Sequence, residues 1–227
     1  MSQPLLVFDM DGVLVDVTDS YRETIARTVE HFSGVPVTPD AIQDVKNQGG
    51  FNDDWELSHH MIATAGVTAA FDDVVAHFQK LFLGVDGVEG LIRRERWIAN
   101  PGALEALGER FRFAVFTGRP RDEAHLTLDR FARNLVFDPI IGMHDVEKKK
   151  PAPDGLQIIA AKSPGVKLYY IGDSVDDARS AEAAGVPFIG IAAPANPRYL
   201  DLVFAFQEIG AYAIVDDINY LHEVFAS

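Results

Sequence analysis

The chain has 227 residues, enough for one domain with a core of ordinary size and a smaller inserted unit. Its formal charge of -14 disfavours nucleic acid and anionic membranes as partners, so an anionic substrate would need a local positive site. The absence of cysteine excludes disulfides, thiolate nucleophiles and cysteine-bound zinc, which leaves oxygen or histidine to hold any metal. The sequence shows neither a membrane-spanning apolar run nor a signal-peptide pattern, which favours a cytoplasmic location.

An apolar run at residues 5–8 predicts a buried parallel strand, and two acids follow it. Asp9 and Asp11 stand two positions apart, directly after this strand. Parallel strands end at the sheet edge where open α/β folds bind ligands, so these carboxylates would lie in a crevice rather than in the core. Their chemistry fits metal binding, nucleophilic attack or proton transfer, and an ordinary turn is the plainer alternative.

Residues 17–90 show a different pattern, with apolar side chains at helical spacing, as in Ile25, Val29 and Phe32. Glycine, proline and asparagine interrupt this pattern, so it predicts several separate amphipathic helices. The interruptions lie near residues 34–36, 48–52 and 84–87.

From about residue 100 onward, short apolar runs alternate with helical patterns. Alternating strands and helices imply an α/β fold in which helices cover both faces of a parallel sheet. The helical stretch is then an insertion, with the core at residues 1–16 and 91–227 and the inserted domain at 17–90. The aromatic residues between Tyr199 and Tyr212 are expected to pack in the core. Strands are predicted at 113–116, 139–142, 168–171, 188–191 and 214–215, and helices at 101–111, 121–135 and 176–184.

Phosphate-binding groups are predicted after two of the later strands. Thr117 and the Gly118 amide follow the strand at 113–116 and could donate hydrogen bonds to phosphate oxygens, although Thr117 could equally cap the next helix. Arg119 comes next and could contact substrate or pair with an acid. Lys150 lies in a run of three lysines and could neutralise a phosphate, whereas Lys148 and Lys149 are expected at the surface.

A second acidic group ends the strand at 168–171. Asp173 is placed to join Asp9 around a hard cation such as Mg²⁺, which prefers oxygen ligands. Asp177 lies one helical turn further and could hold a metal-bound water or orient Lys150. Asp176 is expected to face solvent or to cap the following helix.

Taken in order, these elements resemble the haloacid dehalogenase superfamily, in particular its phosphatases with a helical cap inserted after the first motif. The four motifs of that family match residues 9–16, Thr117, Lys150 with Pro151, and residues 172–177. The resemblance implies a Rossmann-like core with an α-helical cap, and an activity on a small phosphorylated metabolite. The expected oligomeric state is a monomer or homodimer.

The resemblance also implies roles for the core residues. Asp9 would attack phosphorus and form an aspartyl-phosphate, and Asp11 would protonate the leaving alkoxide and then activate water. Thr117, Gly118 and Lys150 would bind the transferring phosphoryl group.

A magnesium ion is implied as cofactor. It would be held by Asp9, Asp173 and the backbone carbonyl of Asp11, with Asp177 also at the metal site, and it would offset the repulsion between carboxylate and phosphate.

Substrate specificity is expected to depend on the inserted segment 46–55, where Lys46, Asn47 and Asn52 are candidate substrate contacts. An ordinary connection between helices is the alternative for this segment. A phosphonate-cleaving enzyme would need a cap lysine, for which Lys46 is conceivable, and a phosphosugar mutase would share the same core. A non-catalytic phosphate-binding or protein-interaction module is the remaining alternative.

Overall fold

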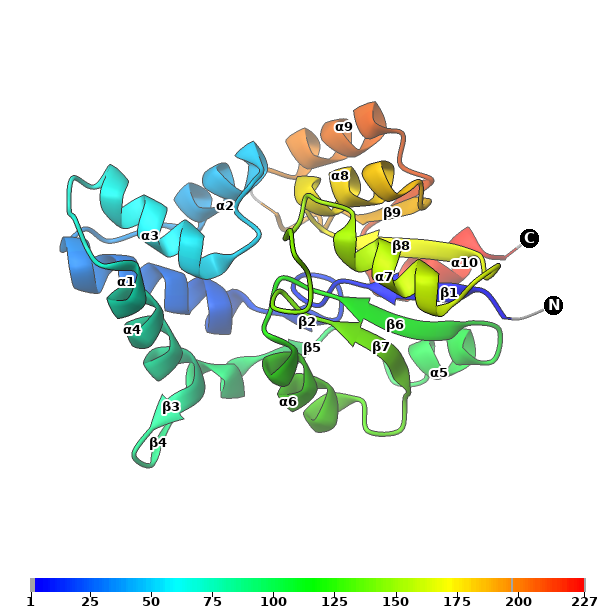
Figure 1. The fold of residues 1–227 in the computed structure, drawn as a ribbon, viewed down its shortest axis with the longest axis horizontal. Coiled ribbons are helices and arrows are strands. Elements are labelled where there is room, and N and C mark those ends of the chain that lie inside the picture. Colours follow the sequence, from blue (N-terminus) through cyan, green and yellow to red (C-terminus); the bar gives the residue numbers. More distant parts are fainter. Residues whose placement is uncertain (1–2, 197, 227) are drawn as a thin grey trace. The chain divides into compact units, whose positions relative to one another are not determined.

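The computed structural model describes residues 3–196 and 198–226, and it divides into two compact units (Figure 1). Unit 1 combines residues up to Val15 with those from Trp97 onward, and unit 2 is Asp16–Arg96. Unit 1 therefore resumes at Trp97, six residues later than the expected position 91. Residues 91–96 belong to unit 2 because the short helix η2 (Leu91–Arg94) packs against η1 (Thr18–Arg22) within that unit.

Unit 1 is built on a six-stranded sheet in the order β10-β9-β8-β1-β6-β7. All of its strand pairs are parallel, which confirms the predicted α/β architecture. β1 lies between β8 and β6, so the chain reverses its direction of strand addition at β1. Its strands are β1 (Leu5–Phe8), β6 (Arg112–Phe116), β7 (Phe137–Ile141), β8 (Leu168–Gly172), β9 (Phe188–Ile191) and β10 (Ala213–Val215).

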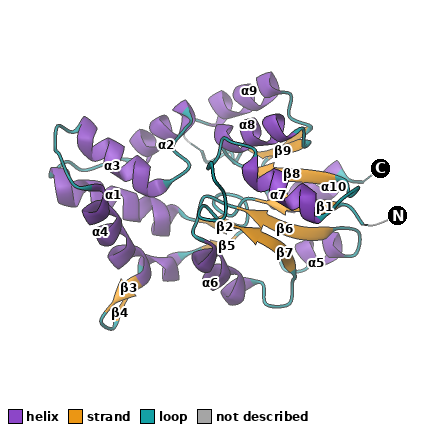
Figure 2. Ribbon diagram, viewed as in Figure 1, coloured by secondary structure: helices purple, strands orange, loops and turns teal. Residues whose placement is uncertain are grey.

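Helices cover both faces of this sheet, as Figure 2 shows. Leu5 and Val7 point to one face, where they join a buried cluster with residues of three helices. Leu6 and Phe8 point to the other face, where the centres of the Phe8 and Phe113 rings lie 5.5 Å apart. The first face carries α7 (Asp154–Lys162), α8 (Val175–Ala184) and α9 (Tyr199–Ile209), and the remaining helices are α5 (Ala103–Gly108), α6 (Arg121–Phe131), η3 (Ile218–Tyr220) and α10 (Leu221–Val224).

Two helix lengths and the burial of the C-terminal aromatic residues in unit 1 differ from the sequence expectation. The helices α5 and α6 are shorter than predicted, because the chain turns at residues 109–110 and again at 133–135. The aromatic residues near the C-terminus divide between core and surface: Phe206 is fully buried, whereas Phe204 and Tyr212 are 62% and 55% exposed. Phe204 is exposed because it lies two positions from Phe206 on α9 and so faces away from the sheet.

Unit 2 is mainly helical, and its helices bury a core of their own (Figure 2). Ile25 and Val29 of α1 are buried, as are Phe78 and Phe82 of α4, and the Tyr21 ring lies 4.0 Å from the Phe82 ring. The main helices are α1 (Glu23–Ser33), α2 (Pro39–Gln48), α3 (Asp54–Thr64) and α4 (Phe71–Leu83).

Unit 2 also contains a small hairpin that the sequence pattern did not predict. Strands β3 (Gly84–Val85) and β4 (Val88–Glu89) pair in antiparallel fashion around Asp86 and Gly87. Asp86 and Gly87 both have positive φ, at 50° and 82°, and an Asp-Gly pair favours this kind of two-residue turn. The chain passes between the units at β2 (Val15–Asp16) and β5 (Arg96–Trp97), which pair with each other. No helix within 3–196 or 198–226 has the length and apolarity needed to cross a membrane.

Candidate active site

Three neighbouring strands of unit 1 end in polar residues at the same edge of the sheet. Asp9 follows β1, Thr117 follows β6 and Asp173 follows β8. Because β1 lies between the other two strands and all three are parallel, these residues gather at the carboxyl edge, where the strand order reverses. The fold therefore brings together residues that are far apart in the chain.

Lys150 connects two buried carboxylates at this edge. Its Nζ lies 3.0 Å from Asp9 Oδ1 and 2.7 Å from Asp177 Oδ1. The three residues are at most 5% exposed, so the ammonium group and both carboxylates are largely withdrawn from water. The Lys150 ammonium also lies over the Phe116 ring, 4.8 Å from its centre, a favourable cation–π position. A cation is thus fixed beside the proposed nucleophile.

The two carboxylates share this ammonium unequally. Burial would raise the pKa of Asp177, but the nearby Lys150 and hydrogen bonds from its neighbours lower it below the ordinary value. Burial raises the pKa of Asp9 to about 7, even though Lys150 opposes that shift. Burial would lower the pKa of Lys150, but Asp177 and Asp9 hold it above its usual value. The Asp177–Lys150 pair therefore carries the stable charges, and Asp9 lies beside it.

Asp177 is held in place by a network around the start of α8. Ser174 caps the helix: its Oγ accepts a hydrogen bond from the Asp177 amide at 3.1 Å and donates to Asp177 Oδ2 at 2.6 Å. The Tyr170 hydroxyl donates to Asp177 Oδ1 at 2.7 Å. Lys150 Nζ donates to Asp177 Oδ1, which is the contact expected of a residue that orients Lys150.

Asp176 does not fit either of its expected positions. It is 3% exposed, so it does not face solvent, and the capping residue of α8 is Ser174. The capping motif places the side chain of Asp177 next to Ser174. Asp176, about 100° further around the helix, faces the protein interior.

An oxygen cluster at this edge suits a divalent cation. Carboxylate oxygens of Asp9, Asp173 and Asp177 lie within 4.8 Å of one another. Gly12 leaves room beside this cluster, because a Cβ atom there would stand 1.9 Å from Asp173 Oδ2, and its φ of 72° also favours glycine. All-oxygen ligands are those that hard cations such as Mg²⁺ prefer. The donor set fits the implied metal.

The side chain of Asp11 points elsewhere and pairs with Arg119. Arg119 Nε donates to Asp11 Oδ1 at 2.7 Å. The Arg119 side chain is 1% exposed, and that of Asp11 is 24% exposed. Of the two alternatives for Arg119, the structure shows the contact with an acid. Any contact of Asp11 with a metal would involve its backbone carbonyl, as the resemblance implies.

Thr117 does not cap the following helix. Its amide donates to the Ile141 carbonyl at 3.0 Å, and its Oγ1 accepts a hydrogen bond from the Arg119 amide at 3.2 Å. The helix α6 begins only at Arg121, after Pro120. Gly118 is half-buried between these contacts. The helix that follows Lys150 in the chain, α7, begins only at Asp154.

The candidate substrate contacts Lys46, Asn47 and Asn52 all lie in unit 2. Lys46 Nζ pairs with Asp54 Oδ1 at 2.7 Å, and Asn47 Oδ1 accepts a hydrogen bond from Gln43 Nε2 at 2.8 Å. Asn52 is half-buried in the connection between α2 and α3. The segment is therefore a polar, internally bonded part of unit 2.

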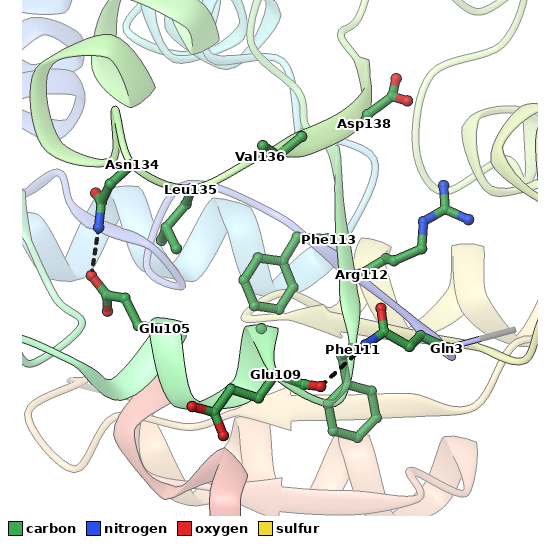
Figure 3. A pocket seen from close by; sticks show the side chains of 11 residues that line it. Gln3, Glu105, Glu109, Phe111, Arg112, Phe113, Asn134, Leu135, Val136 and Asp138 are labelled. Carbon is green, nitrogen blue, oxygen red and sulfur yellow. Dashed lines mark hydrogen bonds between the residues drawn. The ribbon is translucent and has the colours of Figure 1, made fainter.

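A separate cavity of about 530 Å³ opens at the opposite edge of the sheet, near the first residues of β6 (Figure 3). Phe113 and Leu135 point into it, and an Asn134–Glu105 hydrogen bond of 2.8 Å closes one side. Its lining mixes acids, amides and apolar side chains, and no residue of the carboxyl-edge site takes part.

Comparison with known proteins places this site in a family. A model of the haloacid dehalogenase-like hydrolases matches residues 4–185, most of the chain. The chain belongs to this family. The predicted resemblance is thus confirmed, and members of the family generally use a divalent metal, in keeping with the acidic cluster.

Individual relatives differ in name and length. An imidazoleglycerol-phosphate dehydratase of Phytophthora nicotianae is 34% identical over 86% of this chain, but the chain spans only 45% of that protein. A phosphoglycolate phosphatase of Cereibacter sphaeroides is 26% identical over 82% of this chain and 83% of the relative. A crystal structure from Bacteroides fragilis, provisionally assigned as a haloacid dehalogenase-like hydrolase, has a TM-score of 0.75 at 21% identity, covering 97% of this chain and all of the other. This likeness confirms the fold.

Proposed function

We propose that the protein is a magnesium-dependent phosphatase that hydrolyses a small phosphorylated metabolite through an aspartyl-phosphate. The observation that carries this proposal is the buried Asp9 carboxylate, 3.0 Å from the Lys150 ammonium and beside Asp173. The family match and the phosphoglycolate phosphatase relatives support it. A binding module would have no need of a carboxylate nucleophile placed beside a fixed cation and an acidic cluster.

In the first step, an Asp9 carboxylate oxygen forms a bond to phosphorus as the bond from phosphorus to the ester oxygen breaks. The departing oxygen takes a proton from the Asp11 carboxyl group and leaves as an alcohol. Lys150, Thr117 and the Gly118 amide bind the phosphoryl oxygens and oppose the charge that gathers on them.

In the second step, water attacks phosphorus and the bond to Asp9 breaks. Asp11, now a carboxylate, takes a proton from this water, so inorganic phosphate leaves and both aspartates return to their starting states. Lys150 stays bound to Asp177 throughout, which keeps its ammonium in position.

Asp9 and Asp173 are the side chains proposed to hold Mg²⁺, together with the Asp11 backbone carbonyl. When bound, the ion would supply positive charge that reduces the repulsion between carboxylate and phosphate dianion. Asp177 contributes by holding Lys150 beside this cluster.

Substrate choice is proposed to depend on unit 2, which contains segment 46–55 with the candidate contacts Lys46, Asn47 and Asn52. The names of relatives suggest two candidates for a panel of substrates, phosphoglycolate and imidazoleglycerol phosphate. Sugar phosphates and amino-alcohol phosphates complete the panel.

The test is phosphate release from this panel, with Mg²⁺ present or chelated. Wild type should hydrolyse at least one ester in a Mg²⁺-dependent manner, and Asp9→Asn should lose at least ~10³-fold in kcat because an amide cannot serve as the nucleophile. The exposed Asp122→Asn, the same chemical change on α6, is the matched control and should keep full activity.

Folding of Asp9→Asn is checked by circular dichroism and thermal unfolding. Near-normal turnover by a folded Asp9→Asn protein would contradict the role of Asp9 as nucleophile. Interconversion of two sugar phosphates without net phosphate release would instead identify a mutase, and binding without any turnover would identify a non-catalytic module.

A further inference from the structure

Arg119 is a buried arginine of the candidate site, and the steps proposed above assign it no role. Its side chain is 1% exposed and pairs with the carboxylate of Asp11. Nε donates to Asp11 Oδ1 at 2.7 Å, and Nη2 contacts the same oxygen. The guanidinium thus meets one carboxylate oxygen through a hydrogen bond from Nε and an ion-pair contact from Nη2.

The guanidinium is itself fixed by the fold. Nη1 donates to Thr127 Oγ1 of α6 at 3.0 Å, and the Arg119 amide donates to Thr117 Oγ1 at 3.2 Å. The Arg119 carbonyl also accepts a hydrogen bond from the Met143 amide at 2.9 Å. Backbone and side chain are therefore held from three directions, so Arg119 has little freedom to move toward another partner.

This geometry distinguishes the two oxygens of Asp11. All contacts recorded for its carboxylate within the described residues fall on Oδ1. Because Oδ1 is occupied by the guanidinium, proton exchange with a substrate is directed to Oδ2. The Asp11 side chain is 24% exposed, against 1% for Arg119, so Asp11 is the partly accessible member of this pair.

We propose that Arg119 is a positioning residue that orients the Asp11 carboxyl group so that Oδ2 meets the leaving oxygen of the substrate. The inference rests on the proposed function, in which Asp11 is the acid of the first step. The proton passes from Asp11 Oδ2 to the ester oxygen as the bond from that oxygen to phosphorus breaks. Arg119 takes no part in the transfer and makes no contact with phosphate.

The experiment compares two substrates that differ in their need for this proton. An alkyl phosphate, either phosphoglycolate or the best ester of the panel, leaves as a basic alkoxide and needs protonation. p-Nitrophenyl phosphate leaves as a stabilised phenolate and needs it little. The measured quantity is kcat/KM, which covers the steps up to departure of the leaving group and is insensitive to slow hydrolysis of the phosphoenzyme.

Arg119→Met should lower kcat/KM for the alkyl phosphate by ~10²-fold or more, the usual contribution of general acid catalysis, and for p-nitrophenyl phosphate by less than ~10-fold. Thr127→Val, which removes the acceptor for Nη1 and leaves the Asp11 pair intact, should change the ratio of the two values in the same direction by a few-fold. Arg119→Lys keeps a positive charge and should restore only part of the alkyl phosphate activity, because a flexible ammonium cannot reproduce the fixed planar geometry of the guanidinium.

Arg121→Met is the control, since Arg121 is exposed and pairs with Asp145 at 3.1 Å. It should leave the ratio unchanged. If Arg119→Met lowers kcat/KM equally for both substrates, the inference is overturned and a structural or phosphate-binding role is indicated. Thr127→Val decides the question in the same way if Arg119→Met does not fold. An unchanged ratio at full activity would overturn it as well. Failure of the proposed function would be recognised separately, because wild type would then hydrolyse neither substrate.

Discussion

At the scale of single residues, the candidate site depends on one lysine that serves two carboxylates. Lys150 could not remain charged in a dry environment without them, and Asp177 holds it with the shorter contact. The hydrogen bonds that orient Asp177 come from Ser174 and Tyr170. The position of the cation is therefore set by residues that need never touch a substrate.

Tyr170 offers a direct test of this support. Its hydroxyl donates to Asp177 Oδ1 at 2.7 Å and lies 3.1 Å from the Phe116 carbonyl, fully buried. Tyr170→Phe should lower the free energy of unfolding by about 1–3 kcal/mol, because a buried carboxylate loses a donor that water cannot replace. Denaturant unfolding measures the loss.

Tyr169→Phe is the matched control for this prediction. Tyr169 is the preceding residue of β8, and its ring packs at 5.0 Å against Phe225, away from Asp177. The same loss of stability in both variants would show that the Tyr170 hydroxyl contributes nothing beyond an ordinary tyrosine at this sheet.

Residues of the site differ in how far the sequence predicts them. Asp9, Thr117 and Asp173 are predictable because each directly follows an apolar strand, and parallel strands place such residues at one edge. Tyr170 is hidden inside such a strand and has no local signal. The pairing of Arg119 with Asp11 joins residues 108 positions apart, so it follows from tertiary packing and not from any pattern in the sequence.

At the scale of elements, the helices α1 and α4 of unit 2 meet through a pair of histidines. The His31 and His77 rings stack at 3.9 Å with an angle of 10° between their planes, and Phe32 contacts both edge-on. Partial burial lowers the pKa of His77, and the nearby His31 and Lys80 lower it further. This contact therefore favours an uncharged His77.

The stability of the wild type should consequently fall as the pH drops below 6.5, the ordinary pKa of histidine. Below that value the unfolded chain binds a proton that the folded chain takes up only at lower pH, so protonation favours unfolding. His77→Phe keeps the stack and removes this proton. It should reduce the loss of stability between about pH 7.5 and pH 5.5 by at most ~1 kcal/mol, because His77 is only partly shielded from water.

Urea unfolding at the two pH values measures this difference. His125→Phe, at an exposed position on α6, makes the same substitution outside the contact and should leave the pH dependence unchanged. If His77→Phe follows the wild-type pH dependence throughout, the stacked pair has no part in the acid sensitivity of unit 2.

Elements also differ in how well they follow from the sequence. Long periodic segments such as α1 and α4 are predictable because a buried stripe at helical spacing is a strong signal. The hairpin of β3 and β4 is too short to show such a pattern, although its Asp86-Gly87 turn was a local sign of it. Residues 91–96 belong to unit 2 through packing of η2, which no local composition marks.

At the scale of the whole molecule, the two units have separate apolar cores. Unit 1 buries residues of its sheet, such as Leu5 and Tyr170, and unit 2 buries Ile25 and Phe78. The candidate metal residues Asp9 and Asp173 lie entirely in unit 1. A ligand stabilises only the part of a protein whose folded state binds it, so a cation at this site should act on unit 1 alone.

The chain contains two tryptophans, Trp55 in unit 2 and Trp97 in unit 1, so each unit can be followed by itself. Trp55→Phe leaves a reporter of unit 1, and Trp97→Phe leaves a reporter of unit 2. At Mg²⁺ about a hundred times its dissociation constant, binding should stabilise unit 1 by about 2.7 kcal/mol and raise its Tm by ~5–10 °C relative to chelated protein. The Tm of unit 2, reported by Trp55, should rise far less.

Asp173→Asn, introduced into both single-tryptophan proteins, removes one proposed ligand and should abolish the shift at Trp97. A shift of equal size at both reporters would show that the chain unfolds as one cooperative body, contrary to the separate cores. If Mg²⁺ does not change the Tm reported by Trp97 in the protein that retains Asp173, the acidic cluster does not bind Mg²⁺. Because fluorescence reports folding and not turnover, this result stands independently of which substrate the enzyme takes.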